Sequence, residues 1–204
     1  ENGDSAAARA YMRQAIAQGH RVDEAYYYLG RMAEDDMDPE EAIANYMQVA
    51  GGQEYLAAST RTGQILVGSG QLERSQKWFD EQREKYPQLQ DQLYGLEADI
   101  LFRAGAVQEA MQLLNEGLAK APANTSLRYA RAMLSEQQDD LVLMEKDLRI
   151  IIAAEPDNAT ALNALGYTLA DRTTRYTDAL ELVTRALKLQ PNEPAILDSM
   201  GWVL

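Results

Sequence analysis

The sequence repeats itself about every 34 residues, and this period constrains the fold more than any other feature of the chain. A small residue recurs at intervals of 33 to 35 residues, at Gly30, Gly63, Ala98, Ala132, Gly166 and Gly201. Prolines keep the same register at Pro87, Pro122, Pro156 and Pro191. A fixed period of this length is typical of repeat architectures, in which each unit packs only against its neighbours. We therefore expect a stack of repeated units and not one globular core.

Within each unit the apolar residues recur at steps of three and four, as they do over residues 107–118. This spacing predicts helices, two per unit and each about a dozen residues long. Gly70 and Gly105 are expected to end first helices, because glycine adopts the left-handed conformation at little cost. Asp38 and Pro39 are expected to begin a second helix as its N-cap and its first residue. The sequence therefore predicts an all-α solenoid of helix-turn-helix repeats.

The register divides the chain into five full repeats flanked by two partial ones. We expect a single solenoid, residues 1–204, made of a lone second helix (1–22), the full repeats 23–55, 56–90, 91–124, 125–158 and 159–193, and a truncated first helix (194–204). Both ends therefore lie inside a repeat, and we expect the chain to be a piece of a longer protein. The apolar face of the last helix is expected to be uncovered and to support self-association, through Ile196, Leu197, Met200 and Leu204.

Composition excludes most chemistry. The chain has no cysteine, one histidine, and 32 acidic against 19 basic residues, for a net charge of −13. Thiolate metal sites, disulfides and cysteine nucleophiles are thereby excluded, and the negative charge disfavours nucleic acid and anionic bilayers as partners. No signal peptide opens the chain, and no apolar run approaches the roughly 20 residues needed to cross a membrane. We therefore expect no catalytic residues, no cofactor and no membrane span, and hence no enzyme.

Two polar features invite a metal hypothesis and have simpler explanations. The acidic run over residues 34–41 lacks the glycine and the final glutamate of a calcium-binding loop. Its Asp38 is better explained as a helix cap, with Glu40 and Glu41 near the positive helix end. His20 is expected in a solvated link between helices, with no second histidine to help it bind a metal. We therefore predict no metal site.

These columns resemble the tetratricopeptide repeat, a 34-residue helix-turn-helix unit, over the whole chain. The resemblance implies a right-handed superhelix with the first helix of each repeat on the inner groove. A protein or peptide segment is the ligand that such an aromatic and amide-rich groove would hold. The residues expected on this face are Tyr27, Arg31, Thr60, Gln64, Asp99, Arg103, Tyr129, Met133, Asn163, Tyr167, Asp198 and Trp202.

One subgroup of these repeats binds the carboxyl terminus of chaperones through paired lysines and asparagines. Here the corresponding positions hold Tyr27, Arg31, Thr60 and Arg61, so that pairing is absent. We therefore reject the co-chaperone interpretation, although Arg31 and Arg61 could still receive one carboxylate.

A narrower resemblance lies in residues 161–171, 176–180 and 196–203. These segments are similar to tetratricopeptide lipoproteins of γ-proteobacterial outer membranes, especially those of pseudomonads that bind a carboxyl-terminal processing protease. The resemblance implies an adaptor on the periplasmic side of the outer membrane that binds this protease and presents substrates such as cell-wall hydrolases. The lipid-modified cysteine of that group is absent from this sequence.

Two interpretations from different classes stay open at this point. The first is an adaptor whose groove holds a protein segment. The second is a structural spacer in an envelope or cytosolic complex, in which the first-helix residues are ordinary exposed residues. Loss of partner capture after replacing Tyr27, Tyr129 and Tyr167 by alanine would favour the adaptor.

Overall fold

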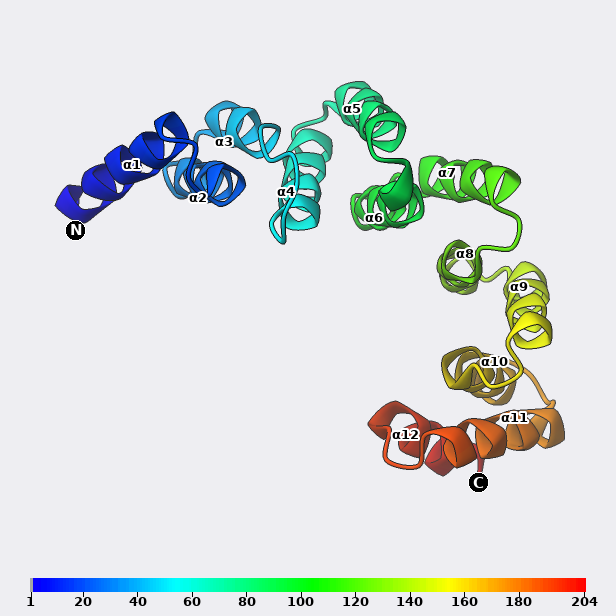
Figure 1. Cartoon of the computed structure of the whole chain (residues 1–204). Coiled ribbons are helices and arrows are strands. Elements are labelled where there is room, and N and C mark those ends of the chain that lie inside the picture. The colour runs from blue at the N-terminus through cyan, green and yellow to red at the C-terminus, as the bar shows by residue number, and fades with distance from the viewer. Residues whose placement is uncertain (1) are drawn as a thin grey trace. The chain divides into compact units, whose positions relative to one another are not determined.

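A computed structural model describes the backbone of residues 2–204 and the side chains from residue 5 onward. The described chain is all-α, as predicted, and contains no strand between residues 2 and 204 (Figure 1). Its helices are α1 (Asn2–Ala17), α2 (Val22–Asp35), α3 (Pro39–Tyr46), α4 (Tyr55–Gly68), α5 (Leu72–Lys85), the 3₁₀ turn η1 (Pro87–Leu89), α6 (Gln90–Arg103), α7 (Val107–Lys120), α8 (Thr125–Gln137), α9 (Leu141–Ala154), α10 (Ala159–Arg172), α11 (Tyr176–Leu189) and α12 (Pro194–Val203).

The chain forms two compact units, which we call unit 1 (Glu1–Ala110) and unit 2 (Met111–Leu204). In unit 1, α2 packs on α1 and α3, and α4 contacts α3, α5 and α6. In unit 2, α8 pairs with α9 and α10 pairs with α11, while α12 packs on α10 and α11. The even-numbered helices from α2 to α12 are the first helices of the predicted repeats, and α3, α5, α7, α9 and α11 are the second helices.

Side-chain caps fix where several helices begin. The Asp38 carboxylate accepts a hydrogen bond from the backbone N–H of Glu41 at 3.0 Å, which confirms the predicted start of α3. Asn124, Asp140 and Asn158 cap α8, α9 and α10 in the same way, each accepting from the N–H three residues ahead. Each cap satisfies a backbone donor that the first turn of a helix leaves unpaired.

Four turns between a first and a second helix share one left-handed residue, whereas the turn between α10 and α11 has none. Gly70 and Gly105 have φ angles of 77° and 84°, as predicted for glycines that end first helices. Met37 and Asp139 stand at the equivalent positions of two other repeats, with φ angles of 59° and 63°. The backbone therefore adopts the same turn at Met37 and Asp139, although a side chain in this conformation has a steric cost.

The recurring small residue allows the two helices of a repeat to approach closely. A Cβ atom built on Gly30 would lie 2.6 Å from the Tyr46 ring, and one on Gly166 would lie 2.6 Å from Val183 Cγ2. At Gly63 the nearest atoms belong to Ile100 and Phe79, at 2.7 and 2.8 Å. Side chains of neighbouring helices thus fill the space that each glycine leaves.

Each unit has its own apolar core between its packed helices. The core of unit 1 includes Tyr46, Trp78 and Phe79, which places Trp78 among packing residues. The core of unit 2 is built from apolar side chains of α8 to α12, including Leu162 and Val183. Burial of such side chains is the main stabilising contribution to repeat stacking.

The prediction that the apolar face of α12 is uncovered is wrong for Ile196. Ile196 is buried in the core of unit 2, because α12 packs on α10 and α11. Met200 is half-buried against the same core, and Leu197 and Leu204 are exposed. Self-association through the exposed residues stays a prediction.

Charged groups are buried at two helix contacts. In unit 1, Arg83 on α5 forms an ion pair with Glu97 on α6, and its guanidinium carbon lies 4.4 Å from the centre of the Tyr94 ring. In unit 2, Asp147 on α9 binds Arg128 and Arg131 on α8. Buried charges require such partners because the protein interior solvates them poorly.

Candidate protein-interaction site

The candidate site is the exposed face of the first helices, which we describe separately in each unit. In unit 1 it begins with Tyr27 and Arg31 on α2. The Tyr27 ring lies 5.7 Å from that of Tyr28 and 5.8 Å from that of Tyr46, measured between ring centres. A hydrogen bond to Tyr27 is the main cause that raises the pKa of Arg31, whose side chain is exposed. These residues form an aromatic patch with one cationic edge.

Arg61 on α4 is already occupied by a carboxylate of the preceding first helix. Its guanidinium binds both carboxylate oxygens of Glu34 on α2, and Tyr46 donates a hydrogen bond to the same carboxylate. The hydrogen bonds from Arg61 are the largest cause that lowers the pKa of Glu34, while burial raises that of Tyr46. Arg61 thus already forms a bidentate internal pair, and the prediction that it receives a partner carboxylate stays untested.

The remaining predicted residues of unit 1 make local contacts. Gln64 accepts a hydrogen bond from Arg61 at 2.8 Å, and the Thr60 hydroxyl donates to the Leu56 carbonyl at 2.7 Å. Asp99 and Arg103 lie one turn apart on α6 and pair with each other at 2.7 Å. Both are exposed, so this pair contributes little to stability.

In unit 2 the face begins with Tyr129 and Met133 on α8. Both side chains are half-buried and pack against the apolar core of the unit. Burial raises the pKa of Tyr129, with a smaller contribution from the negative charge of Glu136. These two residues therefore have a packing role in addition to any role in binding.

The next first helix, α10, carries Asn163 and Tyr167 one turn apart, both half-buried. The Asn163 Oδ1 atom is buried and has no hydrogen-bond partner among residues 5–204. On α12, Asp198 is exposed and Trp202 has 61% of its surface accessible. This face thus combines a buried amide acceptor without a partner and an exposed indole.

Acidic residues of the run 34–41 form ion pairs with arginines of neighbouring helices. Asp36 pairs with Arg9, and Glu40 pairs with Arg74 at 3.0 Å. Glu41 lies 3.6 Å from Arg13. Over the described part of the chain no group of three or more acidic or histidine side chains is arranged to hold a metal ion. His20 is exposed in the link between α1 and α2, as predicted.

Sequence reasoning missed the polar links between successive first helices. Glu34 and Glu136 stand at the same repeat position, four residues after Gly30 and Ala132. Each accepts a hydrogen bond from the next first helix: Glu34 from Arg61, and Glu136 from the Thr168 hydroxyl at 2.9 Å. The sequence signal for these links is the glutamate that occupies the same position in two repeats.

Comparison with known proteins agrees with this architecture. The sequence profile of the tetratricopeptide repeat family matches residues 1–54, 60–125 and 145–194. The chain belongs to the tetratricopeptide repeat family. It is 48% identical over 182 residues to the TPR repeat-containing protein PA4667 of Pseudomonas aeruginosa. That alignment covers 89% of this chain and 31% of the relative, so the chain spans about a third of the relative's length.

Solved structures of tetratricopeptide proteins share the fold at low sequence identity. A tetratricopeptide repeat protein from Parabacteroides merdae is 14% identical, with a TM-score of 0.58 over 89% of this chain and 72% of that one. YrrB, described as a TPR protein with an unusual peptide-binding site, is 18% identical, with a TM-score of 0.54 over 93% and 97%. The first TPR domain of Spaghetti, bound to an HSP90 peptide, is 18% identical, with a TM-score of 0.51 over 55% and 89%.

Family membership gives the general class of the molecule. Tetratricopeptide repeats are scaffolds for protein–protein interaction, and their stacked helices offer long surfaces instead of enclosed catalytic pockets. None of the described helices combines the length and apolarity that crossing a bilayer requires.

Proposed function

We propose that this chain is a non-enzymatic adaptor and that the first-helix face of unit 2 holds an extended segment of a partner protein. The observation that carries the proposal is the Asn163 carboxamide, whose oxygen is buried without a partner among the described residues. An unpaired buried acceptor lowers stability by about 1–3 kcal/mol, and a peptide N–H would satisfy it after a side-chain rotation that brings the oxygen to the surface. The site therefore lacks one donor that a polypeptide backbone can supply.

The residues around Asn163 suit the same ligand. Tyr167 follows it by one turn on α10, and α12 adds the exposed ring of Trp202. Aromatic side chains with one apolar face and one polar edge are enriched at protein interfaces. A polypeptide offers backbone N–H groups to the Asn163 amide and side chains to the rings of Tyr167 and Trp202.

More specifically, we propose that the partner is a periplasmic carboxyl-terminal processing protease and that the chain presents cell-wall hydrolases to it as substrates. Its support is the resemblance of residues 161–203 to pseudomonad outer-membrane lipoproteins and the 48% identity to a Pseudomonas aeruginosa protein. We further propose that the full-length protein lies on the periplasmic side of the outer membrane, anchored by lipid, as the resemblance implies. A cytoplasmic scaffold is the alternative.

The test uses the purified chain and the purified carboxyl-terminal processing protease of Pseudomonas aeruginosa, with affinity measured by calorimetry. Asn163→Ala should weaken binding about tenfold, because each hydrogen bond in a desolvated interface contributes about 1 kcal/mol or more. The same variant should melt at the same or a higher temperature, since it removes the unpaired acceptor. Asn192→Ala, in the exposed link before α12, is the matched control and should bind like the unaltered chain.

Two outcomes would contradict the proposal. Absence of binding by the unaltered chain would remove the protease as partner. Equal binding by the unaltered chain and the Asn163→Ala variant would remove this face as the site and favour the structural spacer.

A further inference from the structure

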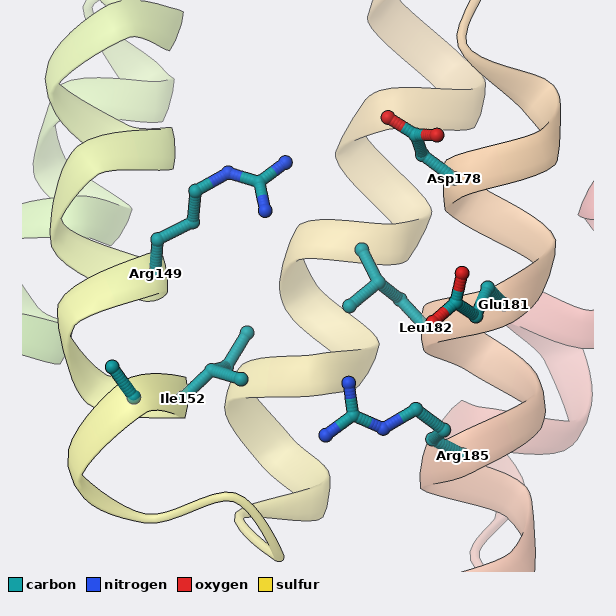
Figure 2. Close-up of a pocket in the computed structure, with 7 residues that line it drawn as sticks. Arg149, Ile152, Asp178, Glu181, Leu182 and Arg185 are labelled. Carbon is teal, nitrogen blue, oxygen red and sulfur yellow. The ribbon is translucent and has the colours of Figure 1, made fainter.

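A cavity of about 370 Å³ lies between α9 and α11 of unit 2 (Figure 2). Its lining comes from second helices only, and it contains none of the residues predicted for the first-helix face. The residues that line it are Arg149, Ile152, Ala153, Asp178, Glu181, Leu182 and Arg185. Cavities of this size hold one or two side chains of a ligand.

Two arginines extend into the gap from opposite walls. Figure 2 shows Arg149 reaching from α9 and Arg185 reaching from α11, with both guanidinium groups directed into the space between the helices. Arg149 binds Glu145 at 2.7 Å, but Glu145 also binds Arg175 at 2.8 Å. One carboxylate is thus shared by two guanidinium groups.

Arg185 has a weaker partner. Its Nη2 atom donates to the Pro156 carbonyl at 3.2 Å, and no carboxylate of the described residues lies within ion-pair distance of it. A guanidinium bound only to one carbonyl retains donors for a carboxylate ligand. Arg185 is therefore the cationic group of the cavity that is most available to an incoming anion.

The acidic residues of the cavity do not neutralise Arg185. Asp178 is engaged by Arg175, whose Nη2 lies 2.8 Å from Asp178 Oδ2. Glu181 lies one turn before Arg185 on α11, beyond ion-pair distance, and its side chain is exposed. Its carboxylate can accept a hydrogen bond from a backbone N–H of a bound chain.

The floor of the cavity is apolar. Leu182 belongs to the buried core of unit 2, and Ile152 packs against that core while part of its surface stays exposed. An aliphatic side chain placed here would extend the core and lose contact with water, which is favourable. The cavity thus offers an apolar floor, a cationic wall and an acceptor at its edge.

We propose that this cavity binds a segment of a partner protein in which an aliphatic residue stands next to an aspartate or glutamate. The aliphatic side chain contacts Ile152 and Leu182, the ligand carboxylate binds Arg185, and Glu181 accepts from the ligand backbone. An anionic membrane fits less well, because a chain with a net charge of −13 is repelled by an extended layer of phosphates. The site goes beyond the proposed function, since it uses the second helices and does not involve Asn163.

The test uses the ¹⁵N-labelled chain and the peptide acetyl-Gly-Ser-Leu-Glu-Ser-Gly-amide, which has no terminal charges. Millimolar peptide should shift the Nε–H signal of Arg185. Matched peptides with glutamine for glutamate, or serine for leucine, should bind about tenfold more weakly, because each lacks one of the two contacts. Arg185→Ala should weaken binding about tenfold, whereas Lys188→Ala, an exposed cation on the same helix outside the cavity, should have no effect.

Several outcomes would overturn the proposal. These are no shift of the Arg185 signal, equal binding of all three peptides, or a shift produced by phosphatidylglycerol vesicles but not by the peptide. Since the Arg185→Ala variant could be less stable, its melting temperature is measured alongside, and the peptide series on the unaltered chain gives an independent result. The Asn163→Ala variant should bind this peptide normally, which separates failure here from failure of the proposed function.

Discussion

Arg131 on α8 binds both carboxylate oxygens of Asp147 on α9, with Nε–Oδ2 and Nη2–Oδ1 distances of 2.7 and 2.8 Å. Asp147 is completely buried, and Arg128 makes a third contact with it at 3.0 Å. The third guanidinium nitrogen of Arg131, Nη1, donates to Asn115 on α7. The two helices of this repeat are therefore joined by a charged cluster at a contact that is apolar elsewhere.

Asp147→Asn keeps the shape of this side chain and removes its charge. Arg128 and Arg131 would then lie close together, largely buried and without a counter-charge, so we expect a loss of about 3 kcal/mol in the free energy of unfolding. Urea denaturation followed by circular dichroism measures it. Asp99→Asn, which breaks an exposed pair, is the control and should leave the midpoint unchanged. Equal midpoints for the two variants would contradict a stabilising role for the cluster.

Gly166 and Gly201 occupy the same repeat position in different surroundings. A Cβ at Gly166 would lie 2.6 Å from Val183 Cγ2 and 3.0 Å from the Ala179 carbonyl oxygen, whereas one at Gly201 would have nothing within 4 Å. We expect Gly166→Ala to destabilise the chain by about 1–3 kcal/mol through overpacking. Gly201→Ala should be neutral or slightly stabilising, because alanine favours the helix. Thermal melts of both variants test this, and equal effects would argue against a close approach at Gly166.

The carboxylate of Glu34 should make stability depend on pH. Its ordinary pKa is 4.5, and the hydrogen bonds from Arg61 hold the pKa lower in the folded chain. A carboxyl with a lowered folded pKa stabilises the fold above its unfolded pKa, and this contribution is lost as the pH falls through the folded pKa. The unaltered chain should therefore be more stable than Glu34→Gln at pH 7, with the difference shrinking below about pH 4.5. Urea midpoints measured from pH 7 to pH 3 provide the test, and a constant difference would contradict it.

Met37 holds a left-handed backbone angle that glycine adopts without strain. Its φ is 59° and its side chain is 88% exposed, so its removal sacrifices little packing. We expect Met37→Gly to raise the free energy of unfolding by up to about 1 kcal/mol, because the steric penalty of a side chain in this conformation disappears. Met37→Ala is the matched control and should give no gain. A loss of stability in the glycine variant would show that Met37 makes contacts that outweigh the strain.

Periodicity was enough to predict the helical hairpins, because every repeat carries the same physical requirements. The close contacts at Gly30, Gly63 and Gly166 require a small residue, and the turn at Gly70 and Gly105 requires a left-handed one. A pattern that recurs for steric reasons can be found by register alone.

The polar interior could not be predicted in the same way. Arg131 stands at the repeat position that holds Leu29 and Leu165 in two other repeats, and only its distance to Asp147 shows that the pair is satisfied. Similarly, register placed Arg61 near the binding face but could not show that Glu34 already occupies it. Ion pairs depend on which rotamers meet across two helices, and residue spacing does not determine that.

The glutamates at the ends of α2 and α8 place an acceptor on one repeat and its donor on the next. Glu34 is matched by Arg61, and Glu136 is matched by Thr168, one helical turn further along its own helix. A repeat that is duplicated, deleted or exchanged would bring its glutamate beside a helix without the corresponding donor. We therefore expect an exchanged repeat to pack well only beside a neighbour that carries a compatible donor.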